Sequence, residues 1–423
     1  MRKYTLEELY HSADSRFGLG STHVITERGL TGYAIRLIEA LERAERLLDG
    51  GEADKAFLYS LRVFCVAGTR DILDDGEVFM TLEKFPVFWQ KIFSAAEEPL
   101  KEWMFTELCR YADERLSWDA QELINGFLFA NFAVFPFVQR LLAFAEKKYD
   151  EEIVTGDVLY SFFAKILVPL RLQNGASPET VLEQLFGWFP SFSPELSSQL
   201  TILIDDPVLQ YCILRNTICA RMADSDEKKQ YQDQLLLLKD LEEKVPEAYR
   251  SFLDFCDTTP GDISSFDTWK AAFPAEHWKF LCGYWYHHLN DRRMDFARKS
   301  GNGILIADAA PGTSYPFYDG QPMPLKEVDA LVPLLEAAYP LELFNLYYKA
   351  LRARLHRSAP RSHYAQTADA LYDLKDLRGS DIAIPLILDA LLEYGCGYPA
   401  FLEELEKRFP GCLKAHEQRI TLS

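Results

Sequence analysis

The residues best suited to bind a metal ion or to move a proton gather between positions 277 and 291. The group contains histidines, a cysteine and an aspartate: His277, Cys282, His287, His288 and Asp291. If this stretch is a helix, His287 and Asp291 stand four residues apart and share one face. No standard zinc spacing is present and aromatic residues surround the group, so an aromatic-packed helix is the main interpretation. We expect no cofactor, and keep His287, His288 and Asp291 as the candidate metal ligands.

A second group of residues is suited to bind an anion. Five basic side chains and no acidic one lie between Asn345 and His363, in a chain whose formal net charge is −19. This basic corner consists of Lys349, Arg352, Arg354, Arg357 and Arg361. Nucleic acid or an acidic protein segment would find charge-assisted hydrogen bonds there. The alternative is that these cations pair with acidic faces of neighbouring helices, where each surface pair contributes about 0–1 kcal/mol.

Two expected helices, 340–358 and 361–377, meet at Pro360 and position the basic corner. In the first, apolar residues follow the i, i+3, i+4, i+7, i+11 spacing of a single helical stripe. They are Phe344, Tyr347, Tyr348, Leu351 and Leu355. Lys349 and Arg352 fall on the side away from that stripe, Arg354 and Arg357 lie on its opposite flank, and Arg361 extends the group across the turn, so we expect the cations to face outward.

The same helical periodicity recurs along the whole chain. Residues 30–48, for example, contain the apolar stripe Ile35, Ile38, Leu41, Ala44 and Leu48. Eight of the 21 prolines follow an aromatic residue. Because proline disfavours helix in the residue before it but suits a first turn, such pairs indicate helix junctions. We predict an all-α fold, an α-solenoid-like array of helical hairpins similar to TPR or HEAT arrays, although the TPR and ankyrin signatures do not recur.

One segment, 300–326, departs from this pattern. It is dense in glycine and proline around the strand-like Ile304-Leu305-Ile306. A long irregular stretch in a helical protein is typical of a functional loop or a linker. We therefore expect N-terminal repeats at 1–150, central repeats at 151–299, this irregular loop, and C-terminal repeats at 327–423.

Composition limits the classes of function. The chain has 423 residues, of which 48% are apolar and 26% charged, as expected of a globular protein. The excess of acidic residues disfavours non-specific binding to nucleic acid or anionic lipid. The longest apolar run, 127–138, is shorter than the roughly 20 residues of a membrane span, and no signal peptide is visible. We therefore expect no membrane partner. Eight cysteines stand singly without a C-x-x-C pair, which favours reduced thiols and a cytoplasmic location.

The second expected helix of the basic corner carries a resemblance to a known family. It reads Arg361-x-x-Tyr364-x-x-x-Ala368-x-x-Leu371-x-x-Leu374-x-x-Leu377, after Leu346-Tyr347-Tyr348-Lys349-Ala350-Leu351. This pattern resembles the helical-repeat region that follows the zinc finger in bacterial SWIM-type proteins. The C-x-C and C-x-H motifs of the finger are absent, so its metal-binding and nucleic-acid-binding roles do not carry over. The resemblance implies an α-solenoid scaffold, for which protein–protein interaction is the usual role.

Three hypotheses of function follow. The chain has no phosphate-binding loop, no H-E-x-x-H and no G-x-S-x-G motif, so we favour a non-catalytic scaffold that binds another protein through a concave surface and the basic corner. The first alternative is an enzyme with a site between the 300–326 loop and the helix 275–293. The second is a nucleic-acid-associated factor that uses the basic corner alone.

Overall fold

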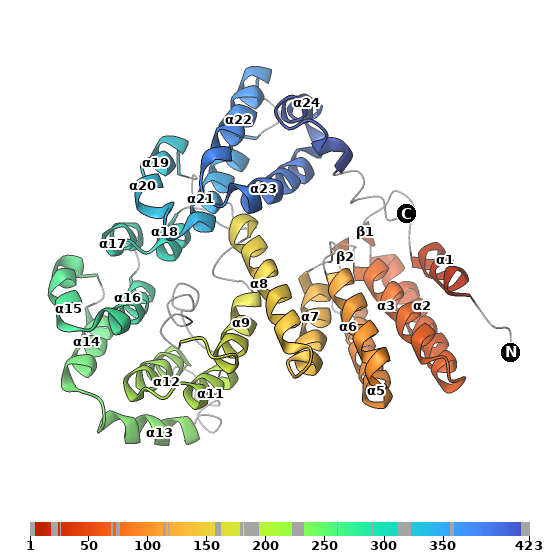
Figure 1. The fold of residues 1–423 in the computed structure, drawn as a ribbon, viewed down its shortest axis with the longest axis horizontal. Helices are drawn as coiled ribbons and strands as arrows, with labels where there is room; N and C mark the ends of the chain where they lie inside the picture. Colours follow the sequence, from red (N-terminus) through yellow and green to blue (C-terminus); the bar gives the residue numbers. More distant parts are fainter. Residues whose placement is uncertain are drawn as a thin grey trace. The chain divides into compact units, whose positions relative to one another are not determined.

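The protein is represented by a computed structural model that covers residues 1–423. It describes residues 5–17, 24–25, 27–68, 71–72, 77–112, 116, 118–156, 162–177, 181, 194–221, 232–259, 261–289, 292–310, 323–355 and 359–415. The chain divides into two compact units, Met1–Phe144 and Ala145–Ser423. The described chain is almost entirely helical, which confirms the all-α prediction (Figure 1). The expected divisions at 150, 299 and 326 stay predictions.

The first unit consists of short helical hairpins. Its helices are α1 (Leu6–Phe17), α2 (Glu27–Asp49), α3 (Ala53–Gly68), α4 (Glu77–Leu82), α5 (Lys84–Ala95), α6 (Glu98–Ala112), α7 (Trp118–Phe132) and the start of α8 (Val138–Thr155). Two-residue strands, β1 (Val24–Ile25) and β2 (Asp71–Ile72), pair in parallel. Consecutive helices pack on one another, α2 on α3 and α6 on α7.

An aromatic cluster joins α3, α5 and α7 in this unit. The ring of Trp89 in α5 lies 5.1 Å from Phe64 of α3 and 5.6 Å from Phe127 of α7, measured between centroids. Its indole N–H donates to Ser60 Oγ at 3.0 Å, so this buried ring leaves no polar atom unsatisfied. The cluster fixes α5 and α7 relative to one another below their exposed faces.

The second unit is built from many shorter helices. After the end of α8 these are α9 (Phe162–Gln173), α11 (Pro194–Leu203), α12 (Pro207–Arg221), α13 (Gln232–Glu242), α14 (Glu247–Thr258), α15 (Phe266–Ala272), α16 (Ala275–His288), α17 (Arg293–Ser300), α18 (Gly303–Ala309), α19 (Leu325–Asp329), α20 (Val332–Leu335), α21 (Pro340–Ala353), α22 (Arg361–Asp373), α23 (Ser380–Tyr394) and α24 (Pro399–Arg408). Single turns of 3₁₀ helix lie at Ile263–Ser265, Leu374–Asp376 and Gly395–Gly397.

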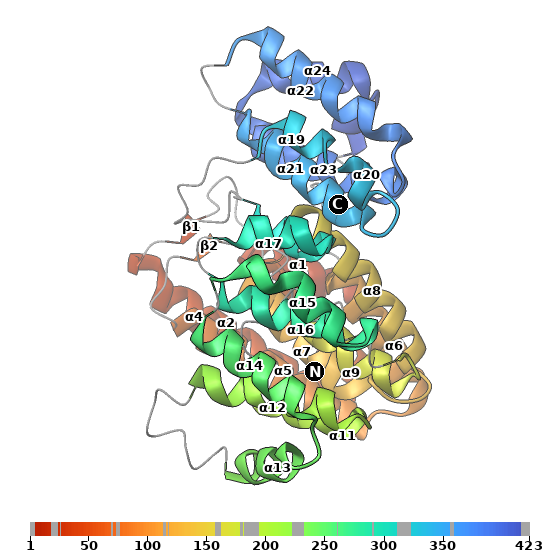
Figure 2. The ribbon, with the colours of Figure 1, turned by 90° about the vertical axis from the view of Figure 1, so that its left-hand side faces the viewer.

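A second aromatic cluster forms the core of α14 to α17, which lie together in Figure 2. The ring of Phe252 in α14 lies 5.2 Å from Trp269 of α15. It also lies 5.8 Å from Trp285 of α16, which in turn lies 5.0 Å from Phe296 of α17. Offset and edge-to-face pairs of this kind each add about 0.5–1.5 kcal/mol beyond the burial of their area. The aromatic-packed character predicted for the helix around residue 280 is therefore confirmed.

The strand-like reading of Ile304–Ile306 is wrong, because these residues belong to α18. Asn302 caps this helix: its Oδ1 accepts the backbone N–H of Ile304 at 2.9 Å and of Leu305 at 3.3 Å. Gly301, with a φ of +70°, ends α17 in the left-handed conformation. The Gly301-Asn302 pair thus separates two helices. The residue types of this stretch alone do not distinguish such a tight helix junction from a long loop. Residues 311–322 of the expected irregular loop lie outside the described residues.

The apolar residues that α2 buries are shifted by one position along the sequence from most of the predicted stripe. Ile35 and Ile38 are 51% and 37% exposed, whereas Leu37 and Ala40 are buried against the unit. The helix has two apolar faces, and the one with the small Ala40 side chain is buried where α2 packs on α3. None of the helices described is both long and apolar enough to cross a membrane.

Candidate functional site

The basic corner lies where α21 ends and α22 begins, as predicted. Pro340 lies in the first turn of α21, and Pro360 occupies the position before α22, where its missing N–H costs no hydrogen bond. All five residues of the predicted apolar stripe, Phe344 to Leu355, are buried. Arg357 lies outside the described residues.

Three of the cations are half-buried and contact other parts of the chain. Lys349 Nζ donates to the carbonyl oxygen of Ala307 at 3.1 Å. The guanidinium of Arg352 lies 4.9 Å from the ring centroid of Tyr394, a cation–π distance. Arg354 donates to two side chains of α22 at 3.2 and 3.4 Å. These side chains therefore do not all face outward as expected.

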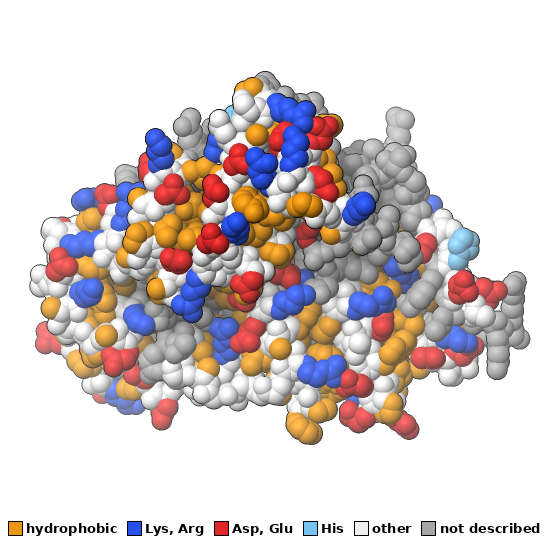
Figure 3. Space-filling model, turned by 45° about the horizontal axis from the view of Figure 1, so that its top comes forward, with side chains coloured by type: hydrophobic (Ala, Val, Ile, Leu, Met, Phe, Trp, Pro, Cys, Tyr) orange, Lys and Arg blue, Asp and Glu red, His pale blue; other side chains and the backbone are white. Residues whose placement is uncertain are grey.

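Arg361 is exposed but forms ion pairs with α24. Its Nε lies 2.7 Å from Glu404 Oε1, and its Nη2 lies 2.6 Å from Glu403 Oε2. Hydrogen bonds from Lys407 and Arg361 lower the pKa of Glu404. Over the C-terminal helices, at the top of Figure 3, basic and acidic side chains are intermixed. This geometry favours pairing within the fold, and binding of a partner at the basic corner stays a prediction.

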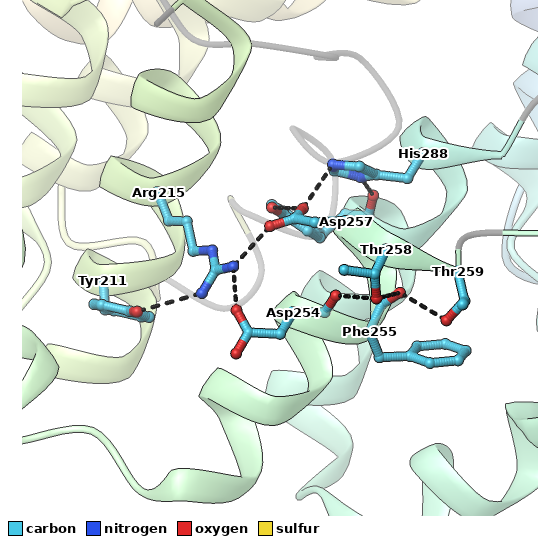
Figure 4. Close-up of polar contacts among 9 residues, drawn as sticks. Tyr211, Arg215, Asp254, Phe255, Asp257, Thr258, Thr259 and His288 are labelled. Atoms are coloured by element: carbon cyan, nitrogen blue, oxygen red, sulfur yellow. Dashed lines mark hydrogen bonds and ion pairs between the residues drawn. The ribbon is translucent and has the colours of Figure 1, made fainter.

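A group of charged side chains joins α12, α14 and α16 (Figure 4). Arg215 of α12 places its Nη2 2.6 Å from Asp254 Oδ1 and 2.6 Å from Asp257 Oδ2, both in α14. On the far side of Asp257, Oδ1 accepts the hydroxyl of Tyr284 at 2.9 Å and lies 3.2 Å from His288 Nε2. The Arg215 side chain is only 13% exposed, so this is a half-buried charge network.

The network strongly favours the ionised form of Asp257. Burial alone would raise the pKa of its carboxyl. Hydrogen bonds from His288, Arg215 and Tyr284 outweigh burial and lower that pKa to about 2. Asp257 is therefore a carboxylate at any physiological pH, and it cannot serve as a general acid.

His288 has no ring nitrogen left for a substrate. Its Nδ1 lies 2.8 Å from the backbone carbonyl oxygen of Tyr284, and its Nε2 faces Asp257. Both ring nitrogens therefore already face hydrogen-bonding groups of the protein. The ring also stacks on Tyr284, with centroids 4.4 Å apart. The arrangement suits a link between helices better than proton transfer to a ligand.

A matching link lies at the other end of the same helix. His277 Nε2 is 3.1 Å from Asp206 Oδ2, and its Nδ1 is 2.6 Å from the Tyr249 hydroxyl. Asp206 also caps α12 through the backbone N–H of Val208. His277 and His288 are eleven residues, or three turns, apart and so share one face of α16. Two polar links therefore hold α12, α14 and α16 together at both ends of the aromatic cluster.

The candidate metal ligands do not gather in the part of the chain that is described. His288 contacts Asp257, whereas the ring of His287 lies against Tyr286 with centroids 5.4 Å apart. Asp291 lies outside the described residues. Within the described ranges, no three histidine, cysteine or acidic side chains are placed to hold a metal ion.

An open apolar groove of about 650 Å³ lies between α5 and α7 in the first unit. Pro86, Val87, Gln90, Lys91 and Ser94 form the α5 wall. Glu122, Leu123, Gly126, Phe127, Ala130 and Asn131 form the α7 wall. Val87 is 63% exposed, and beyond the end of α7 Val134 and Phe135 are 59% and 90% exposed. An apolar hollow with exposed apolar side chains on its wall and nearby is typical of a binding surface.

Gly126 is the least expected residue of this groove. It lies in the interior of α7, where glycine costs roughly 0.5–1 kcal/mol relative to alanine. Its φ is negative, and a Cβ added there would meet no atom within 4 Å. Neither backbone conformation nor close packing therefore requires glycine at this position. Because Gly126 has no side chain, the groove is deeper at this point of the α7 wall.

A smaller hollow of about 330 Å³ lies where the enzyme hypothesis places its site, between α15, α16 and the turn at Ser300–Asn302. Its described lining includes Lys270, Trp278 and Cys282, but no histidine and no carboxylate. Burial raises the pKa of the Cys282 thiol to about 12, which suppresses its nucleophilic thiolate form. The hollow thus lacks an activated nucleophile and a general base among the residues described.

Sequence reasoning missed both the charge network and the groove. Arg215 and its partner Asp254 are 39 residues apart, and no local pattern pairs them. The sequence contains one indication of the groove, which is a glycine within the apolar periodicity of residues 118–132. Comparison with known proteins adds no further evidence, because the chain matches no protein family, no curated protein and no solved structure.

Proposed function

We propose that the chain is a non-catalytic helical scaffold, and that the α5–α7 groove binds an amphipathic helix of a protein partner. The observation that carries this proposal is the apolar groove of about 650 Å³ with Gly126 in its α7 wall. The packing of consecutive helical hairpins supports a solenoid-like, TPR-like or HEAT-like arrangement of repeats. The basic corner is not required for this role, because its described cations already contact the chain.

The walls of the groove favour a helix as its occupant. Both walls are helices whose backbone groups are hydrogen-bonded internally, so the groove has no sheet edge to which a strand could be added. Recognition must therefore come from side-chain packing, as in complexes where an amphipathic helix lies in an apolar groove. The α5 wall extends over Pro86–Ser94, which spans about 13 Å at 1.5 Å per residue. This length holds about two and a half helical turns, with apolar anchors at i, i+3 or i+4, and i+7.

The rim of the groove gives the partner helix an orientation. Lys91 lies on the α5 wall and the exposed Glu122 on the α7 wall. Lys91 Nζ lies 3.2 Å from Glu45 Oε1, but both side chains are about half exposed, and such a pair contributes little. A partner carboxylate can therefore share Lys91. We expect acidic residues on the α5 side of the partner helix and basic residues on its α7 side.

Site-specific photo-cross-linking in the native cell tests the proposal. A benzophenone amino acid at Val87 projects from the groove wall, and the same amino acid at Ile35 is a matched control on α2, 51% exposed. We expect Val87 to form a discrete adduct with one protein and Ile35 not to form it. Mass spectrometry should locate the cross-link in an amphipathic helix of that protein. No adduct at Val87, or the same adducts at both positions, would reject the groove as the binding site.

A further inference from the structure

The hollow of about 330 Å³ in the second unit has the residue types of a small-molecule site. It lies between α15, α16 and the turn that joins α17 to α18, and its volume is at the lower end of the roughly 300–1,000 Å³ that such sites occupy. Its described lining contains two lysines, Lys270 and Lys279, and no acidic side chain. In a chain whose formal net charge is −19, a hollow with this sign of charge indicates an anionic ligand.

Three aromatic side chains line the hollow, and the fold holds them in place. The rings of Phe273 and Trp278 lie 5.4 and 6.0 Å from Phe252, measured between centroids, so both belong to the second aromatic cluster. Tyr339 packs so closely on α18 that a Cβ at Gly303 would lie 2.4 Å from its side chain. Rings that are already fixed lose little further freedom when a ligand binds. The hollow is therefore preorganised for a flat apolar group.

Lys270 supplies a positive charge to the hollow. Its side chain is exposed in the last turn of α15, and it forms no ion pair with the residues described. Its charge acts on the buried thiol of Cys282, whose pKa burial raises to about 12, while a hydrogen bond with Ser300 and then Lys270 act in the opposite direction. Asp267, one turn earlier in α15, pairs with Lys299 at 3.0 Å. A ligand carboxylate at Lys270 therefore competes with no ion pair of the described chain.

Two further side chains of the lining carry hydrogen-bond donors. Asn302 uses its Oδ1 to cap α18, and its Nδ2 makes no hydrogen bond to any residue that the structure describes. The indole N–H of Trp278 also lacks a hydrogen bond to the described part of the chain. An ionised carboxylate has acceptors only, so the ammonium group and these N–H groups match it in type.

We propose that this hollow binds a small aromatic monocarboxylate, with its carboxylate at Lys270 and its ring against Phe273 and Trp278. A lysine and a carboxylate form a charge-assisted hydrogen bond, and aromatic walls favour a ring over an alkyl chain. Inorganic phosphate matches the charge but would leave the aromatic walls without a contact. The described lining has no histidine and no carboxylate to act as a general base, so the site binds its ligand without changing it.

Fluorine NMR of the full-length chain, labelled with 5-fluorotryptophan, tests this site. The chain has seven tryptophans, and the resonance that disappears in Trp278→Phe identifies the reporter. The probe is 3-phenylpropionate, and 3-phenylpropionamide has the same shape without the charge. We expect the carboxylate to shift the Trp278 resonance saturably and the amide to bind at least about tenfold more weakly. Lys270→Met should weaken carboxylate binding equally, whereas Lys239→Met, which removes an exposed lysine of α13, should leave it unchanged.

A Trp278 resonance that does not move, or equal Kd values for the carboxylate and the amide, would overturn the proposal. So would carboxylate binding that Lys270→Met leaves unchanged. If Trp278→Phe does not fold, isothermal titration calorimetry with 3-phenylpropionate decides between wild type, Lys270→Met and Lys239→Met, since both lysines are exposed. Equal affinities of the three proteins would overturn the site. The described lining of the hollow shares no residue with that of the α5–α7 groove, so either proposal can fail without the other.

Discussion

Replacing Gly126 by leucine should stabilise the first unit. Gly126 is in the interior of α7 with a negative φ, and its Cβ position is empty to 4 Å. Leucine is therefore expected to enter without strain, and the difference in helix propensity between the two residues is about 0.8 kcal/mol. For a unit the size of Met1–Phe144, this corresponds to a rise in Tm of about 3 °C.

Differential scanning calorimetry of the full-length chain measures this shift, and Gly32→Leu calibrates it. Gly32 lies inside α2 of the same unit, is exposed, and also has no atom within 4 Å of its Cβ position, but it does not line the groove. Both variants should raise Tm by similar amounts. A lower Tm for Gly126→Leu beside a higher one for Gly32→Leu would refute the reasoning, because Gly126 would then be required by the fold and not by a ligand.

The remaining predictions concern the second unit. Asp257→Asn should lower the free energy of unfolding by about 2 kcal/mol in urea titrations, whereas Asp254→Asn, at a site 66% exposed, should cost no more than about 1 kcal/mol. Because the network lowers the pKa of Asp257 to about 2, the stability that the ionised Asp257 contributes is complete above pH 3.8 and is lost as pH falls toward 2. Acid titration of the free energy of unfolding should show this loss in wild type and not in Asp257→Asn. Asn302→Ala removes the cap of α18 and should cost about 1 kcal/mol, and a cost near zero would contradict the cap. In the folded protein, Cys282 should react with a thiol reagent far more slowly than in urea, since burial raises its pKa to about 12.

The sequence was most informative where one helix face is uniformly apolar. Phe344, Tyr347 and Leu351 follow helical spacing and are all buried. Burial of this helix extends beyond the predicted stripe, because Leu343, Leu346 and Ala350 are buried as well. It was less informative for α2, whose two apolar faces differ by one residue. The helices that pack on α2, α3 and α4 among them, decide that Leu37 is buried and Ile38 exposed, and periodicity does not identify these neighbours.

Polar residues in the core were the hardest to predict. Glu342 and Asn345 interrupt an apolar pattern that gives no reason to bury them, and the carbonyls at the end of α8 that Asn345 contacts are about 190 residues away. The cations of the basic corner show the same limit. Their spacing indicated which sides of the helix they occupy, but not that Tyr394 or Glu404 would lie opposite. The spacing of charges describes a single helix, whereas an ion pair also depends on which second helix lies beside it.

The central claim, that the α5–α7 groove binds a partner helix, is tested most directly by one affinity comparison. The segment cross-linked at Val87 is synthesised as a fluorescent peptide, and its Kd is measured by anisotropy for wild type, Gly126→Leu and Gly32→Leu. The calorimetric test first checks that both variants retain the fold, so that the shape of the groove is the remaining difference between Gly126→Leu and wild type. We predict that Gly126→Leu weakens binding at least tenfold, about 1.4 kcal/mol, and that Gly32→Leu binds as wild type. Equal Kd values for all three proteins would contradict the account.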